Sequence, residues 1–471
     1  MMQLLEESFT NMKAQFEKKE LKKKSENLSD WYTDVILKAE LADYAPVKGT
    51  MVIRPYGYAI WEKVQEIFNG MMKTRGVQNA YFPLFIPHSL LEKEKEHVKG
   101  FAPELAIVTI AGGEKLKDPL VVRPTSETIM YAMYAKWIHS WRDLPMLINQ
   151  WNNVVRWEKR TYPFLRTSEF LWQEGHTAHE TEKEAMEMVL TALDWYRQIY
   201  EDYFALPVVY GIKSESEKFA GAKATYAIEA LMPDGKALQA ATSHNLGQNF
   251  SKPFDITFQN RVGQENFVWQ TSWGLSTRSL GGLFMAHGDD NGLILPPNIA
   301  PVQVVIMPIF QKTKDAVTSY CGQLKEALTN GGIRVHVDMR EEPSVGRRFN
   351  QWEVKGVPLR FEIGQKEIED RSVTVVRRDT GAKVMLKRDQ MLVETERLLK
   401  DIQKHLFEKQ KQFLNKNTHD VDTYEEFKKI METSRGYLRA FWCEEAVCEV
   451  RIKDETKATT RCFPLGAKEG N

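Results

Sequence analysis

Two long strand-like segments joined by one short loop constrain the fold of this chain more than any other feature. They are residues 147–158, "LINQWNNVVRWE", and residues 164–179, "FLRTSEFLWQEGHTAH", on either side of the loop around "KRTYPF". A stretch with apolar residues at helical spacing, residues 57–76, precedes them and stops at Gly76. A helix followed by an antiparallel strand pair argues against a simple βαβ nucleotide-binding fold.

A pair of prolines divides the chain. Residues 294–301, "ILPPNIAP", predict a linker, because paired prolines fit neither a helix interior nor a central strand. Strand and helix patterns alternate after it, which indicates a small α/β sheet, and a charged helical region follows. We therefore expect an α/β (α+β) protein with a mixed domain at 1–297, an α/β domain at 298–400 and an extension at 401–471.

Composition excludes several classes of protein. The 471 residues contain 64 Lys and Arg against 64 Asp and Glu, so any nucleic-acid surface has to be a local patch. No run approaches the ~18 apolar residues that span a bilayer, and the first residues lack the pattern of a signal peptide. Four cysteines are too few for a disulfide framework, so the expected compartment is the reducing cytoplasm.

The strand pair carries charged and aromatic side chains at even spacing. Alternation along a strand places Arg156 and Glu158 on one face of the sheet, and the same holds for Arg166 and Phe170 on the returning strand. Such a face offers bidentate donors for a phosphate and an aromatic ring for a base. The alternative is an exposed ion pair on a solvated sheet, worth under ~1 kcal/mol.

Three further segments of the first domain favour a binding site. Residues 121–130, "VVRPTSETIM", have hydroxyls and a carboxylate before an apolar helix, a start that resembles a capping box. Residues 237–250 place Gln239, Thr242 and His244 close together, and residues 270–284 run from a glycine-containing strand into a helix. Each has a structural explanation by itself, but all of them in one domain favour a shared function.

These segments resemble the motifs of class II aminoacyl-tRNA synthetases. Residues 156–170 resemble motif two, "WGLSTRSLGGLF" resembles motif three, and "NAYFPLFIP" resembles motif one, which forms the dimer interface in that family. Taken in order, seven segments resemble prolyl-tRNA synthetases of the archaeal and eukaryotic type over roughly residues 28–450: "RPTSE", "VVRWE", "LWQEGHTAH", "KFAGA", "TSHNLGQNF", "SWGLSTR" and "KGVPLRFEIG".

The resemblance implies an antiparallel-sheet catalytic domain, an anticodon-binding domain at 298–400 and a role for each matching residue. Arg156 and Arg278 are the expected catalytic residues. ATP is expected to contact Arg156, Glu158, Arg166, Phe170, Gln239, Thr242, Ser276 and Arg278. Proline is expected to contact Thr125, Glu127, Arg156, Trp172, Glu174, Phe219 and His244, although His244 also suits a purely structural role. The tRNA anticodon is expected to contact Arg347, Trp352, Glu353 and Lys355.

The implied reaction charges tRNA(Pro) with proline, with ATP as substrate, Mg²⁺ as its counter-ion and a homodimer as the working form. It agrees with the residues, because bringing two anions together requires arginines and a metal ion rather than a general base. The interval from Phe170 to Thr271 is too short and too regular for an inserted editing domain, so misactivation of alanine and cysteine is expected. A synthetase for another small amino acid, such as threonine, and an inactive RNA-binding relative are the alternatives.

The second domain contains residues suited to contact tRNA, and the extension contains cysteines that could bind zinc. Residues 347–388 contain eleven Lys or Arg and six Asp or Glu, a local excess suited to phosphate contacts. Cys443 and Cys448 match half of the four-cysteine zinc site of many relatives, and Cys462 stands alone. Because structural zinc sites usually have four protein ligands, we predict that this chain binds no zinc.

Overall fold

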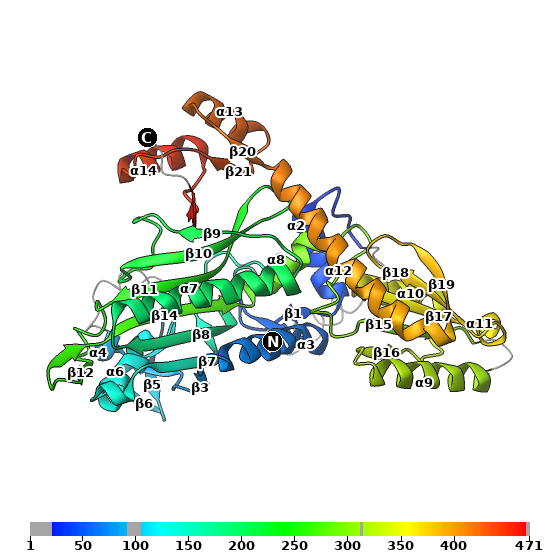
Figure 1. Ribbon diagram of the computed structural model, residues 1–471, viewed down its shortest axis with the longest axis horizontal. Coiled ribbons are helices and arrows are strands. Elements are labelled where there is room, and N and C mark those ends of the chain that lie inside the picture. Colours follow the sequence, from blue (N-terminus) through cyan, green and yellow to red (C-terminus); the bar gives the residue numbers. More distant parts are fainter. Residues whose placement is uncertain (1–20, 92–104, 311–313, 468–471) are drawn as a thin grey trace.

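A sheet of eight strands forms the centre of the first part of the chain (Figure 1). The structure is a computed structural model that describes residues 21–91, 105–310 and 314–467; residues 1–20, where the predicted catalytic domain starts, lie outside the described residues. All neighbouring strands of this sheet are antiparallel except β3 and β7. The strands, in spatial order, are β22 (Phe463–Pro464), β9 (Val209–Ile212), β10 (Ala224–Leu231), β11 (Ala237–Gly247), β14 (Trp269–Ser276), β8 (Glu169–His179), β7 (Met146–Val155) and β3 (Gln78–Asn79).

The predicted antiparallel pair is confirmed, but its strands are shorter than the alternation suggested. β7 pairs with β8 from Met146↔Ala178 to Val155↔Glu169. Arg156, Glu158 and Arg166 therefore lie in the connecting loop, and the expectation that they belong to the strands is wrong. The physical reason is local: the backbone of Arg166 exchanges hydrogen bonds with that of Tyr162, at 2.6 and 2.9 Å, which closes a turn before β8 begins.

Helices cover the sheet and form a large core with it. α7 packs on β11 and β14, as Figure 1 shows in front of the sheet. Trp61, Phe68 and Trp273 are fully buried in this core, where Phe68 makes an edge-to-face contact with Trp273 at 6.1 Å. The helical segments of this part are α2 (Leu28–Lys38), α3 (Pro55–Lys73), α4 (His88–Leu91), α6 (Glu127–Trp137), η2 (Trp141–Asp143), α7 (Glu182–Gln198), η3 (Ile199–Tyr203) and α8 (Arg278–His287).

Smaller sheets extend this domain. A three-stranded antiparallel sheet in the order β4–β6–β5 leads into α6, and two two-stranded sheets lie elsewhere on the domain. Their strands are β1 (Ala42–Tyr44), β2 (Met51–Ile53), β4 (Phe85–Pro87), β5 (Ala106–Ala111), β6 (Glu114–Val122), β12 (Thr257–Gln259) and β13 (Glu265–Phe267).

His287, the last residue of α8, is expected to make the free energy of unfolding depend on pH. His287 is buried, its Nε2 donates to the Phe204 carbonyl at 2.7 Å, and burial lowers its pKa to about 3 although that hydrogen bond raises it. Below pH ~6.5 the unfolded chain binds a proton here that the folded chain does not, so stability is lost as pH falls. We expect His287 to contribute a loss of ~1.4 kcal/mol per pH unit between pH 6 and 4.

Denaturant unfolding of the native protein and of His287→Gln at several pH values measures this contribution. The variant is expected to be less stable at neutral pH, because it loses a shaped core residue, but to lose less stability on acidification. Equal slopes in the two proteins would show that other groups, such as His179 with its pKa lowered to about 4 by burial, account for the acid sensitivity.

The proline-rich segment between the two domains is packed rather than exposed. It contains no helix or strand, as predicted, but both of its first two prolines are buried. Leu295 belongs to the core of the first domain, whereas Ile294 belongs to the core of the second. Backbone hydrogen bonds from Leu293 to Val354 and from Leu295 to Gly356, both 3.0 Å, tie the segment to the second domain.

The second domain is a five-stranded sheet with helices, as the alternating pattern predicted. The sheet order is β16–β15–β17–β18–β19, with β15 parallel to β16 and β17 and the other pairs antiparallel. The elements are β15 (Val304–Pro308), α9 (Lys314–Asn330), β16 (Val335–Val337), α10 (Val345–Val354), β17 (Leu359–Ile363), α11 (Gln365–Glu369), β18 (Ser372–Arg377), β19 (Lys383–Lys387), η4 (Arg388–Gln390) and α12 (Met391–Lys416).

The extension returns to the first domain. The predicted boundary at 400 falls inside α12, which continues to Lys416 and leads to the last elements. These are β20 (Thr418–Asp420), α13 (Tyr424–Thr433), β21 (Tyr437–Arg439), α14 (Ala446–Thr456) and β22. β22 pairs with β9, so the end of the chain becomes the edge of the central sheet (Figure 1). All four cysteines are free thiols.

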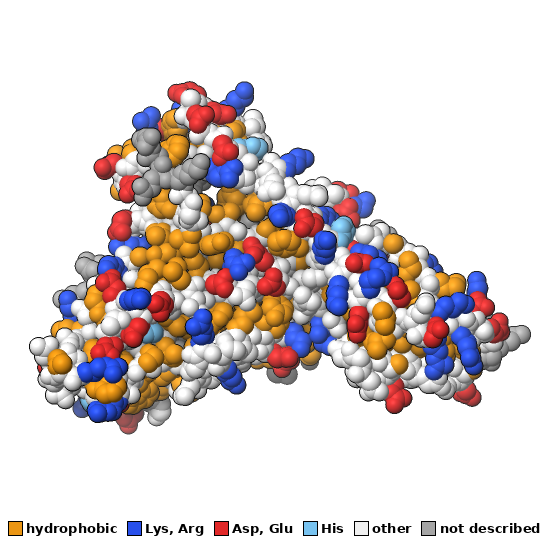
Figure 2. Space-filling view, in the orientation of Figure 1, with side chains coloured by type: hydrophobic (Ala, Val, Ile, Leu, Met, Phe, Trp, Pro, Cys, Tyr) orange, Lys and Arg blue, Asp and Glu red, His pale blue; other side chains and the backbone are white. Residues whose placement is uncertain are grey.

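The surface shows mixed charge. On the face seen in Figure 2, Lys and Arg alternate with Asp and Glu over the second domain, while hydrophobic side chains gather over the first. No helix in the described part of the chain is both long and apolar enough to cross a membrane.

Candidate active site

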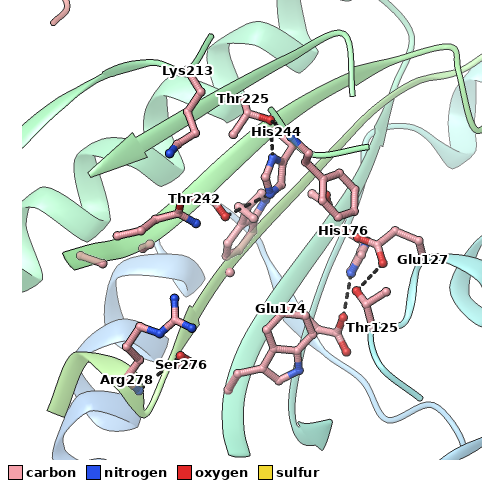
Figure 3. Close-up of a pocket in the computed structure, with 18 of the residues that line it drawn as sticks. Thr125, Glu127, Glu174, His176, Lys213, Thr225, Thr242, His244, Ser276 and Arg278 are labelled. Atoms are coloured by element: carbon pink, nitrogen blue, oxygen red, sulfur yellow. Dashed lines mark hydrogen bonds and ion pairs between the residues drawn. The ribbon is translucent and has the colours of Figure 1, made fainter. Parts of the chain in front are cut away.

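A pocket with an empty volume of about 930 Å³ opens on the central sheet. Its walls come from strands β8, β10, β11 and β14, from the start of α6 and from the segment that follows β9 (Figure 3). Most of the predicted substrate-binding residues meet here: Thr125, Glu127, Arg156, Phe170, Trp172, Glu174, Phe219, Gln239, Thr242, His244, Ser276 and Arg278.

A buried carboxylate anchors one end of the pocket. Glu174 is 2% exposed and accepts hydrogen bonds from the backbone and hydroxyl of Ser126, from Gln150 at 3.1 Å, from Asn152 at 2.6 Å and from His176 at 3.2 Å. Burial raises the pKa of Glu174, but these hydrogen bonds and the charge of His176 outweigh it, so the pKa lies below its usual value. Glu174 is therefore an ionised carboxylate at neutral pH.

His176 is its charged partner. Burial lowers the pKa of His176, but the hydrogen bond to Glu174 and the charges of Glu127 and Glu174 raise it above its ordinary value. The other ring nitrogen of His176 lies 3.1 Å from the Tyr131 hydroxyl. The two groups form a buried ion pair in which both side chains are almost fully excluded from solvent.

The start of α6 adds a second carboxylate. Glu127 is 3% exposed and accepts a hydrogen bond from the Thr125 hydroxyl. The expected capping box is wrong, because Ser126 makes no side-chain cap and uses its hydroxyl for Glu174 instead. Among the described residues, Glu127, Glu174 and His176 are the three potential metal ligands that lie within 4.8 Å of one another. Their two carboxylates offer acceptor oxygens for a cation.

An apolar and aromatic wall faces this group. The His244 ring packs on Phe219 with centroids 4.6 Å apart, and its two nitrogens lie 2.9 Å from the Thr225 hydroxyl and 3.0 Å from the Thr242 hydroxyl. The hydroxyls fix the orientation of the ring. A structural role for His244, the alternative left open by the sequence, is thus compatible with its position in the wall.

Two arginines provide positive charge at the other side. The Arg156 guanidinium lies over Phe170 and Trp172, 5.5 and 5.4 Å from the ring centroids, and its Nε donates to the Pro124 carbonyl at 3.0 Å. Arg278 is the first residue of α8 and donates through Nε to the Leu165 carbonyl at 3.0 Å. These backbone bonds orient both guanidiniums, and a guanidinium is a planar donor group that suits anionic oxygens.

Glu158 and Arg166 do not line the pocket. They form an ion pair with 2.7 Å between Arg166 Nε and a Glu158 carboxylate oxygen, and the Arg166 side chain is 56% exposed. An ion pair, the alternative that the sequence left open, is therefore present for these two residues, but it lies in the loop and not on a solvated sheet face. Their charges nevertheless reach Arg278, whose pKa is lowered first by burial and also by Arg166, and raised by Glu158.

Comparison with known proteins assigns the family. Residues 109–287 match the tRNA synthetase class II core domain (G, H, P, S and T), residues 303–397 an anticodon binding domain, and residues 424–471 the prolyl-tRNA synthetase C-terminal domain. The proline–tRNA ligase of Natranaerobius thermophilus is 55% identical over 453 residues, which cover 96% of this chain and 94% of that protein. The chain belongs to the proline–tRNA ligase family.

Other members agree in sequence and in fold. The proline–tRNA ligase of Borreliella burgdorferi is 52% identical and covers 94% of this chain and 92% of its own. The crystal structure of prolyl-tRNA synthetase from Cryptosporidium parvum complexed with halofuginone and AMPPNP superposes with a TM-score of 0.90 at 47% identity, covering 94% of this chain and 92% of that chain. The predicted family resemblance and the class II fold are thus confirmed.

The anticodon-binding domain of this proline–tRNA ligase places the four predicted tRNA contacts differently. Arg347 is exposed on α10. Trp352 donates through Nε1 to Asp338 at 2.9 Å, and the Lys355 amine pairs at 2.5 Å with Glu40 of the catalytic domain. Glu353 is half-buried, and its carbonyl accepts from Arg378. Arg347 is therefore the predicted contact most accessible to RNA.

The pocket also contains residues that sequence reasoning missed. His176 lies two residues after Glu174 on the same strand, so the alternation of β8 would have placed it on the same face. Thr225 and Lys213 lie outside the segments that resemble synthetase motifs, and they reach the pocket because β9 pairs with β10 and β10 with β11. No local pattern in the sequence signals that pairing.

Proposed function

We propose that this proline–tRNA ligase charges tRNA(Pro) in two steps, through prolyl-adenylate. The observation that carries the proposal is one pocket in which two buried carboxylates face two oriented guanidiniums across aromatic rings. An amino acid with its ammonium at one end and its carboxylate toward ATP fits that distribution of charge. The core, anticodon-binding and C-terminal family matches support the same activity.

Proline binds at the carboxylate end. Its cyclic ammonium has two N–H donors, which bond to Glu127 and to the hydroxyl oxygen of Thr125. Its apolar ring packs against Trp172, Phe219 and His244. Glu174 pairs with His176 and keeps the start of α6 in place through Ser126, so Glu174 orients the wall of the proline site and adds to its negative potential.

ATP binds at the arginine side. Its adenine stacks on Phe170, while Arg156 and Arg278 contact the phosphates. Arg166 and Glu158, which pair with each other outside the pocket wall, contact the phosphates and the adenine amino group where ATP extends beyond the pocket. Gln239, Thr242 and Ser276 contact the ribose and phosphates. ATP enters as its Mg²⁺ complex. The group Glu127, Glu174 and His176 is a poor Mg²⁺ site, because Mg²⁺ prefers oxygen ligands and Glu174 is already hydrogen-bonded on both oxygens.

The chemistry follows from the charges. A proline carboxylate oxygen attacks the α-phosphorus, the new O–P bond forms as the α–β bridging P–O bond breaks, and pyrophosphate leaves with the electron pair. The carboxylate is already ionised, so the protein supplies orientation and positive charge rather than a base. A terminal ribose hydroxyl of the tRNA then attacks the prolyl carbonyl carbon and AMP leaves.

The first experiment is amino-acid-dependent ATP–pyrophosphate exchange with each of the twenty amino acids. Exchange with proline is expected, with weaker exchange for alanine and cysteine, because a missing methylene costs only ~1–3 kcal/mol of discrimination. The interval from Phe170 to Thr271 contains α7, η3 and β9 to β13, which supports a chain without an editing domain of its own. Exchange with another amino acid alone, or with none, contradicts the proposal.

Assembly and location complete the proposal. We propose a homodimer formed through the segment that resembles motif one, where Tyr81 and Phe85 are exposed apolar side chains. Sedimentation velocity of the purified protein tests the homodimer, and a monomer at micromolar concentration contradicts it.

The four free thiols support the predicted cytoplasmic location. Metal analysis of the same preparation checks the predicted absence of bound zinc.

A further inference from the structure

Lys213 is a buried cation in the pocket for which the proposed mechanism has no role. It lies just after β9, is 4% exposed and contributes to the pocket wall. Figure 3 shows its side chain reaching into the pocket near Thr242, on the side away from Glu174. Within the described part of the chain its amine has no hydrogen-bond partner. An ammonium has three N–H donors, and burying them without a partner costs free energy unless a ligand accepts hydrogen bonds from them.

The nearby acidic groups do not satisfy this amine. The closest, Glu229 on β10, is fully buried with one carboxylate oxygen 3.4 Å from Lys213 Nζ, and the partly exposed Glu217 lies at 4.0 Å. The other oxygen of Glu229 accepts from Arg461, at 2.7 Å from Nη2 and 3.3 Å from Nε. Glu229 is therefore shared between two cations, and the second carboxylate near Lys213, that of Glu217, lies beyond hydrogen-bond distance.

Arg461 reaches this position because the end of the chain joins the sheet. β22 pairs with β9 in the register Phe463↔Ile212 and Pro464↔Gly211. A side chain at Gly211 would bring a Cβ within 1.8 Å of the Phe463 carbonyl oxygen, so only glycine permits this approach. The C-terminal domain thus supplies one member of a buried charge row that ends in the pocket.

We propose that Lys213 binds phosphate oxygens of a substrate, and that Arg461 keeps its charge available by pairing with Glu229. This inference rests on the proposed function, which brings two phosphate sources to the pocket: the polyphosphate of ATP and the 3′-terminal phosphates of tRNA. A phosphate oxygen within reach of the amine supplies the hydrogen-bond acceptor that the pocket lacks there. Without Arg461, the whole charge of Glu229 draws Lys213 away from the ligand.

Lys213→Met in the full-length protein tests the first half of the inference. We expect a rise of about 10- to 100-fold in the KM for ATP in exchange, or in the KM for tRNA in transfer from preformed adenylate, since a charge-assisted hydrogen bond is lost. The two assays distinguish the two phosphate sources. Lys223→Met is the matched control, because Lys223 is an exposed lysine near the same strands, paired with Glu182, and we expect no change.

The role of Arg461 is tested by comparing its variants in the native protein and in Lys213→Met. Arg461→Met is expected to raise the same KM several-fold in the native background and to have no further effect in Lys213→Met, whereas Arg461→Lys retains part of the function. An equal effect in both backgrounds would show that Arg461 only supports the fold.

Failure of the proposed function and failure of the inference about Lys213 give different results. A native protein with no proline-dependent exchange contradicts the proposed function. A native protein with normal exchange and a Lys213→Met variant that is folded, as judged by its thermal unfolding, and unchanged in both assays overturns the inference about Lys213 alone.

Discussion

Replacing Arg156 by alanine is expected to reduce proline-dependent ATP–pyrophosphate exchange by about 10²- to 10⁴-fold. The guanidinium lies over Phe170 and Trp172 and is oriented by the Pro124 carbonyl, and it lines the pocket where we propose that the two reacting anions bind. Loss of two charge-assisted hydrogen bonds removes ~3–6 kcal/mol of transition-state stabilisation. Initial rates at saturating and limiting ATP measure the change in kcat and in kcat/KM.

Two further variants make the result specific. Arg156→Lys keeps the charge but loses the planar, bidentate donor, so it is expected to remain at least about tenfold impaired. Arg160→Ala removes an exposed arginine from the same loop and is expected to leave the rate unchanged. If Arg156→Ala retains activity within a few-fold of the native protein, the anions bind elsewhere and the proposed orientation of the substrates is wrong.

Replacing Glu174 by leucine is expected to lower the free energy of unfolding by about 3–5 kcal/mol. The change leaves the buried cation His176 without its counter-charge and leaves donors of Ser126, Gln150 and Asn152 without an acceptor. Exchange activity is expected to fall with it, because Ser126 precedes α6, which carries Glu127. Urea unfolding at pH 7, followed by tryptophan fluorescence, measures the loss.

Two further variants distinguish an unpaired buried charge from a general packing defect as the cause of the stability loss in Glu174→Leu. Asp420→Asn removes one partner of an exposed ion pair with Arg439 and is expected to cost under ~1 kcal/mol. The double variant Glu174→Leu, His176→Leu removes both buried charges and is expected to recover part of the lost stability. No recovery in the double variant would indicate that the shape of the site, rather than an unpaired charge, explains the loss.

The pair of Glu174 and His176 also makes the stability of the native protein depend on pH. The lowered pKa of Glu174 means that its contribution to stability is present above the ordinary range of a glutamate and is lost as pH falls through the folded value. The raised pKa of His176 means that its contribution is present below ~6.5 and is lost as pH rises through the folded value. The ion pair is therefore strongest between the lowered pKa of Glu174 and the raised pKa of His176.

Much of the site could be predicted because its residues lie in short segments with a regular period. Phe170, Trp172 and Glu174 alternate along β8, and the same alternation puts Thr242 and His244 together on β11. Such neighbours share a face whatever the rest of the fold does. Resemblance to synthetase motifs then brought these segments into one site, and the pocket contains all of the expected residues except Glu158 and Arg166.

The errors arose where strands end and helices begin. Alternation predicts no strand end, so Phe164 to Arg166, the second half of the turn that Tyr162 and Arg166 close, were predicted as strand. Ser126 has the chemistry of a helix cap, but a buried carboxylate from β8 takes its hydroxyl. The prolines near 296 were expected in a linker, and the sequence did not indicate that both of them are buried. The turn is a local feature that alternation does not reveal, whereas at Ser126 and at the prolines a long-range contact outweighs a local preference.

The amino-acid order of this chain was sufficient to indicate the class II fold and the order of its domains through resemblance to contiguous motifs, and it brought most of the predicted substrate-binding residues to one pocket. The position of Lys213 in the pocket depends instead on Glu229 and Arg461, which lie 16 and 248 residues further along the chain. Their contacts exist because β22 pairs with β9 and β9 with β10. Register between strands that are distant in sequence is a property of the folded sheet, so this charge row could be found in the tertiary structure alone.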